Sequence, residues 1–103
     1  MKLLFALLLS LPLLAGAKQK LPADVAKFID NAEMCEHFAG EWDDTDKARQ
    51  REITQAVAQS CGAAQQQLKR LRVKYAKEPE IRKVIDDNAN DAVMSFRTQG
   101  KAD

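Results

Sequence analysis

The side chains best suited to chemistry lie close together in one short peptide, Cys35-Glu36-His37-Phe38-Ala39-Gly40-Glu41-Trp42. It contains the only histidine and the only tryptophan of the 103-residue chain. Three kinds of chemistry suit these residue types. They are nucleophilic catalysis by a thiol and an imidazole, binding of a divalent metal, and recognition of a partner through an aromatic side chain.

Nucleophilic catalysis requires the Cys35 thiol and the His37 imidazole to meet. Two residues apart on a helix, their side chains point about 200° away from each other. A cysteine held in a disulfide is also no nucleophile. The chain has no phosphate-binding loop and no plausibly placed Ser/His/Asp set. We therefore expect a protein that is not an enzyme and needs no cofactor.

Metal binding requires Glu33 and His37, which are four residues apart and share a helix face. Glu41 continues the spacing but follows Gly40, where we expect the helix to end because glycine can adopt the left-handed conformation that closes a helix. One imidazole and one carboxylate form a weak metal site. A periplasmic metal-binding or stress-related protein is therefore our alternative prediction.

The same peptide also has a structural interpretation. His37 would favourably occupy the negative end of its helix dipole, and Phe38 and Trp42 would pack over the corner between two helices. If Trp42 is exposed instead, an aromatic side chain beside the acidic Glu41 is typical of a partner-recognition site.

The first 17 residues, MKLLFALLLSLPLLAGA, have the pattern of an export signal. Lys2 supplies the positive start, Leu3–Leu14 form the apolar core, and Ala15-Gly16-Ala17 is a small-residue cleavage site. The apolar run is shorter than the roughly 20 residues of a membrane span. We expect cleavage near Ala17, a mature chain in the periplasm or the medium, and no transmembrane anchor in it.

The charges balance overall but are strongly segregated. Without Lys2 the chain has 15 basic and 15 acidic residues, which excludes nucleic-acid binding driven by bulk charge. Residues 24–46 hold eight acids and one base, whereas residues 47–83 hold ten bases and three acids. Either an acidic helix lies against a basic one, or the basic face with Arg70, Lys74 and Lys77 binds an anionic envelope component.

Apolar residues recur at helical spacing and no strand pattern is present, which predicts an all-α protein. We expect helices over residues 22–39 and 46–77 and a third from Pro79, within a helical domain of residues 18–97 and before a disordered tail of residues 98–103. The second helix keeps one apolar face across Gly62, so we expect it to be continuous; two helices meeting at Gly62 are the alternative. The run from Asp86 to Asp91 is a poor helix former, and the third helix can end there.

The two cysteines, Cys35 and Cys61, both fall on the apolar faces of their predicted helices. An even cysteine pair in an exported protein is typical of a disulfide. A Cys35–Cys61 bond would join the first two helices as an antiparallel hairpin. The third helix would then return over the second, which predicts a small three-helix bundle.

The chain resembles a group of small exported bacterial proteins for which no activity is established. The resemblance covers most of the mature chain and rests on Cys35, His37, Phe38, Gly40, Glu41, Cys61, Leu71, Lys74 and Tyr75. It implies an envelope location and a fixed cysteine pair, and it supplies no catalytic residues. We therefore predict a periplasmic protein that binds an envelope protein or a cell-wall component, as an inhibitor or immunity protein does. Its contact residues would be Glu41 and Trp42, or Arg70, Lys74 and Lys77.

Overall fold

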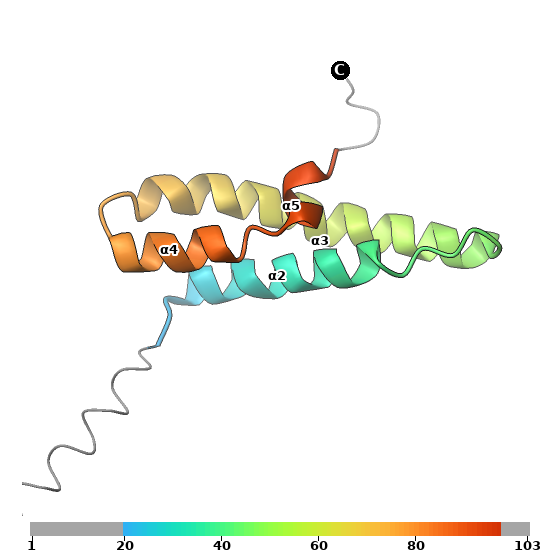
Figure 1. The fold of residues 1–103 in the computed structure, drawn as a ribbon, viewed down its shortest axis with the longest axis horizontal. Helices are drawn as coiled ribbons and strands as arrows, with labels where there is room; N and C mark the ends of the chain where they lie inside the picture. Colours follow the sequence, from blue (N-terminus) through green and yellow to red (C-terminus); the bar gives the residue numbers. More distant parts are fainter. Residues whose placement is uncertain (1–19, 98–103) are drawn as a thin grey trace, which may run out of the picture.

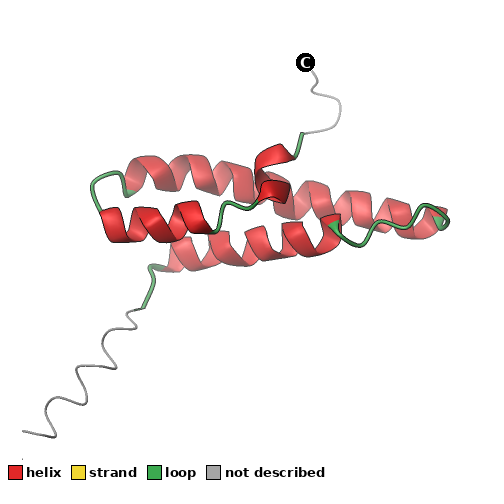
Figure 2. Ribbon diagram, in the orientation of Figure 1, coloured by secondary structure: helices red, strands yellow, loops and turns green. Residues whose placement is uncertain are grey.

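The computed structural model describes residues 20–97, which form four helices and contain no strand (Figures 1 and 2). The predicted all-α class is confirmed. The helices are α2 (Ala23–Ala39), α3 (Lys47–Lys74), α4 (Pro79–Asp87) and α5 (Asp91–Ser95). Four helices form where we expected three. The predicted export signal and the predicted tail of residues 98–103 lie outside the described residues.

Helices α2 and α3 form an antiparallel hairpin whose contact is made by small side chains. Ala32 and Cys35 of α2 and Cys61 and Ala64 of α3 are all at most 1% exposed. The predicted Cys35–Cys61 disulfide is confirmed, and its two Cα atoms are 4.7 Å apart. Small residues at these positions allow the two helix backbones to approach this closely.

The hydrophobic core extends along the hairpin from this contact toward the beginning of α2. Helix α4 lies alongside the C-terminal half of α3 and the first half of α2 (Figure 1). The core therefore takes residues from all four helices, among them Val25, Phe28, Leu68, Leu71, Ile85 and Val93, and also includes Tyr75 just after the end of α3. The N-terminal turns of α3 extend past the end of α2, where the connecting loop runs beside them.

Helix α3 is a single helix through Gly62. This was predicted, because the apolar residues before and after Gly62 fall on the same helix face. It ends at Lys74, three residues before the predicted end. Tyr75 leaves the helical conformation with a φ of −104°, and the Glu78 amide donates to the Tyr75 carbonyl at 3.0 Å. Pro79 begins α4, and the residue before a proline is disfavoured in helix, so the chain must turn ahead of it.

The third predicted helix is broken between Asp87 and Asp91, within the run of poor helix formers. Asn90 caps the new helix α5, because its Oδ1 accepts from the Val93 amide at 3.0 Å. Its Nδ2 donates to the carbonyl of Ala32 on α2 at 3.0 Å. The two bonds fix the start of α5 against α2.

The end of α5 is fixed by a side chain of α3. Gln65 Nε2 donates to the carbonyls of Val93 and Phe96, at 2.8 and 2.7 Å. Val93 is completely buried beneath this contact. A five-residue helix is too short to be stable alone, so these tertiary bonds hold it in place.

Helix α2 ends at Ala39, as predicted, but Gly40 does not use the left-handed conformation that is open to glycine. Gly40 ends α2 with φ −85° and ψ −4°, in the right-handed region that any residue adopts. A Cβ there would meet the Glu36 and His37 carbonyl oxygens at 3.6 Å, an ordinary contact. A hydrogen-bonded turn at Gly40 and Glu41 follows α2. Position 40 therefore does not require glycine.

Candidate functional site

The loop of residues 40–46, between α2 and α3, is fixed by its own polar side chains. Asp46 caps α3 by accepting from the Arg49 amide at 3.0 Å. Asp43 Oδ1 accepts from the Thr45 amide and hydroxyl at 2.9 and 2.7 Å, and these bonds hold the Asp43 pKa below its ordinary value. Gln50 Nε2 donates to the Asp43 carbonyl at 2.7 Å. These hydrogen bonds hold the loop in one conformation.

Trp42 is the most prominent side chain of this loop. It is 51% exposed, and its indole N–H donates to Asp44 Oδ1 at 2.9 Å, which fixes the orientation of the ring. Beside the ring is a largely apolar pocket of about 320 Å³, which we call the Trp42 pocket. Its lining residues are Ala39, Trp42, Ile53, Thr54, Val57, Ala58, Phe96 and Arg97.

The predicted metal ligands Glu33 and His37 are both exposed on α2. The His37 ring packs edge-on against Phe38, with ring centroids 5.0 Å apart. Glu41 does not join them, because its carboxylate lies 3.6 Å from Arg49 Nη2. Within residues 20–97 no three His, Cys, Asp or Glu side chains are grouped as a metal site requires. The part of the chain that the structure describes supplies no third ligand for this pair.

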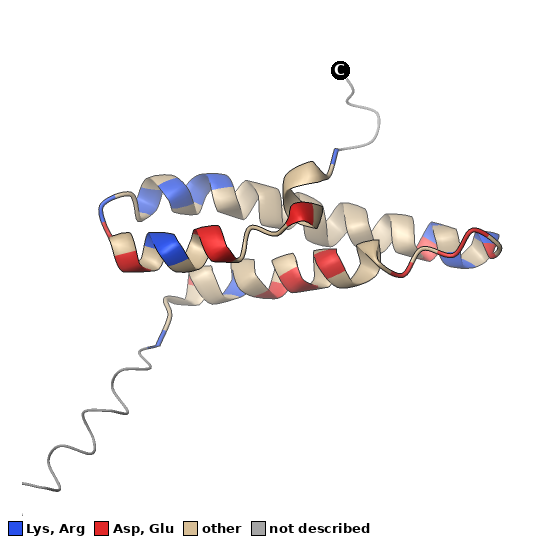
Figure 3. Ribbon diagram, in the orientation of Figure 1, with Lys and Arg blue, Asp and Glu red and all other residues tan. Residues whose placement is uncertain are grey.

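The predicted basic face occupies the last turns of α3, and Figure 3 shows it separated from the basic start of α3 by an uncharged middle. Lys69, Arg70 and Lys77 are exposed, and they form no ion pair with any other described residue. Lys74 differs, because its Nζ lies 2.7 Å from Asp24 Oδ2. Among these bases Val73 is 78% exposed.

Asp24, Lys74 and Tyr75 form a cluster that joins the start of α2 to the end of α3. The Tyr75 hydroxyl donates to Asp24 Oδ1 at 3.0 Å, and Lys74 bonds the other carboxylate oxygen. The Lys74 hydrogen bond, followed by that of Tyr75, lowers the pKa of Asp24. Burial, followed by the Asp24 hydrogen bond, raises the Tyr75 pKa.

The sequence analysis missed this cluster, although a signal for it was present. In an antiparallel hairpin joined at residues 35 and 61, position 24 lies opposite position 72. The disulfide register therefore places Asp24 within one turn of Lys74 and Tyr75.

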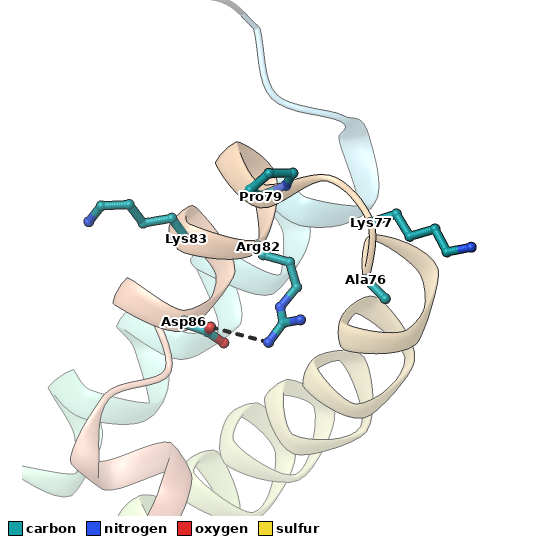
Figure 4. A pocket seen from close by; sticks show the side chains of 6 residues that line it. All are labelled: Ala76, Lys77, Pro79, Arg82, Lys83 and Asp86. Atoms are coloured by element: carbon teal, nitrogen blue, oxygen red, sulfur yellow. Dashed lines mark ion pairs between the residues drawn. The ribbon is translucent and has the colours of Figure 1, made fainter.

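A second groove of about 560 Å³ lies where the chain turns from α3 into α4 (Figure 4). The Arg82 side chain extends into it, with Nη2 3.8 Å from Asp86 Oδ2 and a buried Nε that has no hydrogen-bond partner. Lys77 and Lys83 also line it, but Figure 4 shows their ammonium groups pointing away on opposite sides. The cations do not converge on one point, so the groove is a poor anion site.

The two predicted contact surfaces lie at opposite ends of α3. Glu41 and Trp42 are beside its first turns, whereas Arg70, Lys74 and Lys77 are on or just beyond its last turns. From Val57 to Arg70 the helix rises about 20 Å. One small ligand cannot contact both surfaces.

The acidic residues of α2 do not generally pair with the bases of α3. Asp24–Lys74 is the one ion pair between the two helices among the described residues. Asp30, Glu33 and Glu36 are exposed to solvent. The segregated charges therefore contribute one ion pair to the hairpin, which also has an apolar contact, a disulfide and a hydrogen bond from Asn31 Nδ2 to Gln67 Oε1 at 3.0 Å.

Comparison with known proteins finds no matching family model, curated protein or solved structure. Among the helices of residues 20–97, none has both the length and the apolar character that a membrane span requires.

Proposed function

We propose that this chain is a small exported binding protein that engages an envelope protein through the loop of residues 40–46 and the Trp42 pocket beside it. We call this surface the Trp42 corner. The observation that carries this proposal is a half-exposed tryptophan, oriented by Asp44, beside the apolar Trp42 pocket. Tryptophan is enriched among the residues that dominate binding energy at protein interfaces. Export, with cleavage near Ala17, would place this surface in the periplasm or the medium.

The rigidity of the corner supports binding over a purely structural role. Side-chain bonds of Asp43 and Asp46 order the loop in advance, so a partner need not order it on binding. A compact disulfide-linked hairpin with one fixed aromatic contact suits an inhibitor or immunity protein that blocks a cell-wall-directed enzyme. No described group of residues favours the metal-binding alternative with Glu33 and His37.

The test is a capture experiment with the full chain, expressed in a bacterium and recovered after export. N-terminal sequencing first checks cleavage near Ala17. The exported protein is then immobilised in its oxidised form and exposed to an envelope extract at low and high salt. We expect one stoichiometric partner that is retained at high salt and lost with Trp42→Ala.

The matched control is the double variant Arg70→Ala/Lys77→Ala, which removes charge from the opposite end of α3. We expect it to retain the partner. Loss of the partner with this variant and not with Trp42→Ala would move the site to the basic face. Capture of nothing by any of the three proteins would contradict the proposal.

A further inference from the structure

The last turns of α3 and the turn after it carry a dense run of positive charge. Residues 69–77 hold five bases and no acid. Two of these bases, Arg72 and Lys74, have carboxylate partners on α4 and α2. The other three form no ion pair with any described residue, and they are Lys69, Arg70 and Lys77. Their charge is therefore available to an external partner.

These three bases accompany an exposed apolar side chain. Val73 is 78% exposed, more than any other large hydrophobic residue of the described chain. On α3, Lys69, Arg70 and Val73 fall within about 100° of the helix surface. This surface lies opposite the side that buries Leu68 and Leu71 in the core.

Lys77 extends this surface beyond the end of the helix. It follows α3 in the turn toward α4, and Figure 4 shows its ammonium group pointing away from α4. We call Val73 with Lys69, Arg70 and Lys77 the Val73 face.

The arrangement of the Val73 face suits an extended anionic surface. Its bases are spread along the outer side of α3 at the end that turns into α4 (Figure 3), so they do not converge on one small anion. A soluble polyanion would use the charges alone. A bilayer also accepts the apolar side chain, which can enter the boundary between headgroups and acyl chains, while lysine and arginine stems extend along it.

We propose that the Val73 face binds the surface of an anionic lipid bilayer. The three unpaired bases contact headgroup phosphates, and Val73 enters just below them. Each base near an anionic bilayer raises the affinity about fivefold. Glu78 and Glu80 lie at the edge of this surface without ion pairs and oppose the attraction. The association is therefore weak, reversible and sensitive to salt.

The inference does not rest on the proposed function, because it concerns the other end of α3. Val57 of the Trp42 pocket and Val73 lie 16 residues apart on one continuous helix, a rise of about 24 Å. A molecule bound to a bilayer through the Val73 face would keep the Trp42 corner free for a protein partner.

The first test is co-sedimentation of the oxidised, exported protein with lipid vesicles. We expect binding to phosphatidylglycerol vesicles at low salt, loss at high salt, and no binding to phosphatidylcholine vesicles. Arg70→Ala/Lys77→Ala should weaken the binding at least about tenfold, whereas Glu78→Gln/Glu80→Gln should strengthen it.

The matched control is Lys47→Ala/Arg51→Ala, which removes the same charge at the start of α3. Lys47 and Arg51 also form no ion pair within residues 20–97. This variant should bind phosphatidylglycerol vesicles much more tightly than Arg70→Ala/Lys77→Ala does. Equal weakening by the two variants would mean that binding follows total charge, and would overturn the inference.

Tryptophan emission tests which end of the molecule meets the lipid. Trp42 is the only tryptophan of the chain, so its emission should not change when the unaltered protein binds vesicles. Trp42→Phe/Val73→Trp moves the reporter to the Val73 face, where we expect a shift to the blue. Circular dichroism establishes that this variant remains helical.

Three results would contradict the inference. They are a blue shift of Trp42 in the unaltered chain, equal binding to the two kinds of vesicle, and no binding to either. Binding to soluble polyglutamate without binding to phosphatidylglycerol vesicles would also overturn it, in favour of an acidic protein partner.

Discussion

At the scale of single residues, Gly62 is a position where the sequence is not optimal for stability. It lies inside α3, where glycine costs about 1 kcal/mol relative to alanine. A Cβ at this position would meet Phe96 Cε2 at 3.9 Å, an ordinary van der Waals contact. We expect Gly62→Ala to raise the free energy of unfolding by about 0.5–1 kcal/mol, measured by urea denaturation. Destabilisation would show that α3 and Phe96 are closer than described.

Gly40→Ala is the companion substitution. Because Gly40 has an ordinary right-handed conformation, we expect alanine there to be tolerated, with a change below about 0.5 kcal/mol. A large loss at Gly40 would mean that the turn after α2 does need a left-handed residue.

Asp24 should make stability depend on pH in the acid range. Its pKa is lowered in the folded protein, chiefly by Lys74 and then by Tyr75, so folding favours the carboxylate. The stabilisation is complete above the pKa of the unfolded chain and is lost as pH falls through the folded pKa. We expect Asp24→Asn to cost about 0.5–1 kcal/mol at pH 7, since the pair is partly exposed, and progressively less as the pH falls through the lowered pKa of Asp24.

The measurement is the difference in unfolding free energy between the unaltered chain and Asp24→Asn at several pH values. Asp30→Asn is the matched control, because Asp30 is exposed on the same helix and forms no ion pair among the described residues. A constant difference for Asp24→Asn across this range would show that its carboxylate is not held by Lys74 and Tyr75.

At the scale of elements, α5 depends on two polar side chains from outside its own turns. Asn90→Ala removes both the cap of α5 and its bond to the Ala32 carbonyl. We expect a loss of about 1–2 kcal/mol and faster hydrogen exchange of the α5 amides. Asn88→Ala is the control, because the Asn88 side chain bonds only the Val84 carbonyl within α4. Equal effects from both variants would argue against a specific role for Asn90.

The elements differ in how far the sequence could predict them. Apolar residues at helical spacing along one face predicted both α2 and α3. Helix α2 begins within one residue of the expected start. Helix α5 could not be predicted as a separate helix, because five residues are too few for periodicity and its position depends on Gln65 and Asn90. The end of α3 was missed because local propensity continues past Lys74, while Pro79 requires the chain to turn.

The site was predicted less completely than the fold. That Trp42 follows the end of α2 could be read from the sequence, but its exposure and the pocket beside it depend on how Ile53 and Phe96 pack. Lys74 was predicted as a contact residue for a partner, and its Nζ lies 2.7 Å from Asp24 Oδ2. Helical periodicity gives the direction of a side chain, whereas its partner on another helix depends on the register between the two.

At the scale of the whole molecule, the Cys35–Cys61 bond closes a 26-residue loop within a domain that has a small core. Removing such a bond costs about 3–4 kcal/mol in the chain-entropy view. We expect the double variant Cys35→Ala/Cys61→Ala to lose about this amount in denaturant unfolding, and a reducing agent to destabilise only the unaltered chain. If the reducing agent destabilised the double variant equally, its effect on the unaltered chain could not be assigned to the Cys35–Cys61 disulfide.

The position of this disulfide also determines what a protease can do to the protein. The corner loop with Trp42 lies between the two cysteines, so a single cut there leaves both fragments covalently joined. The cut chain would keep α2 attached to α3 at its most tightly packed point. The exposed loop of the hairpin can thus be cut by a protease without the two fragments separating.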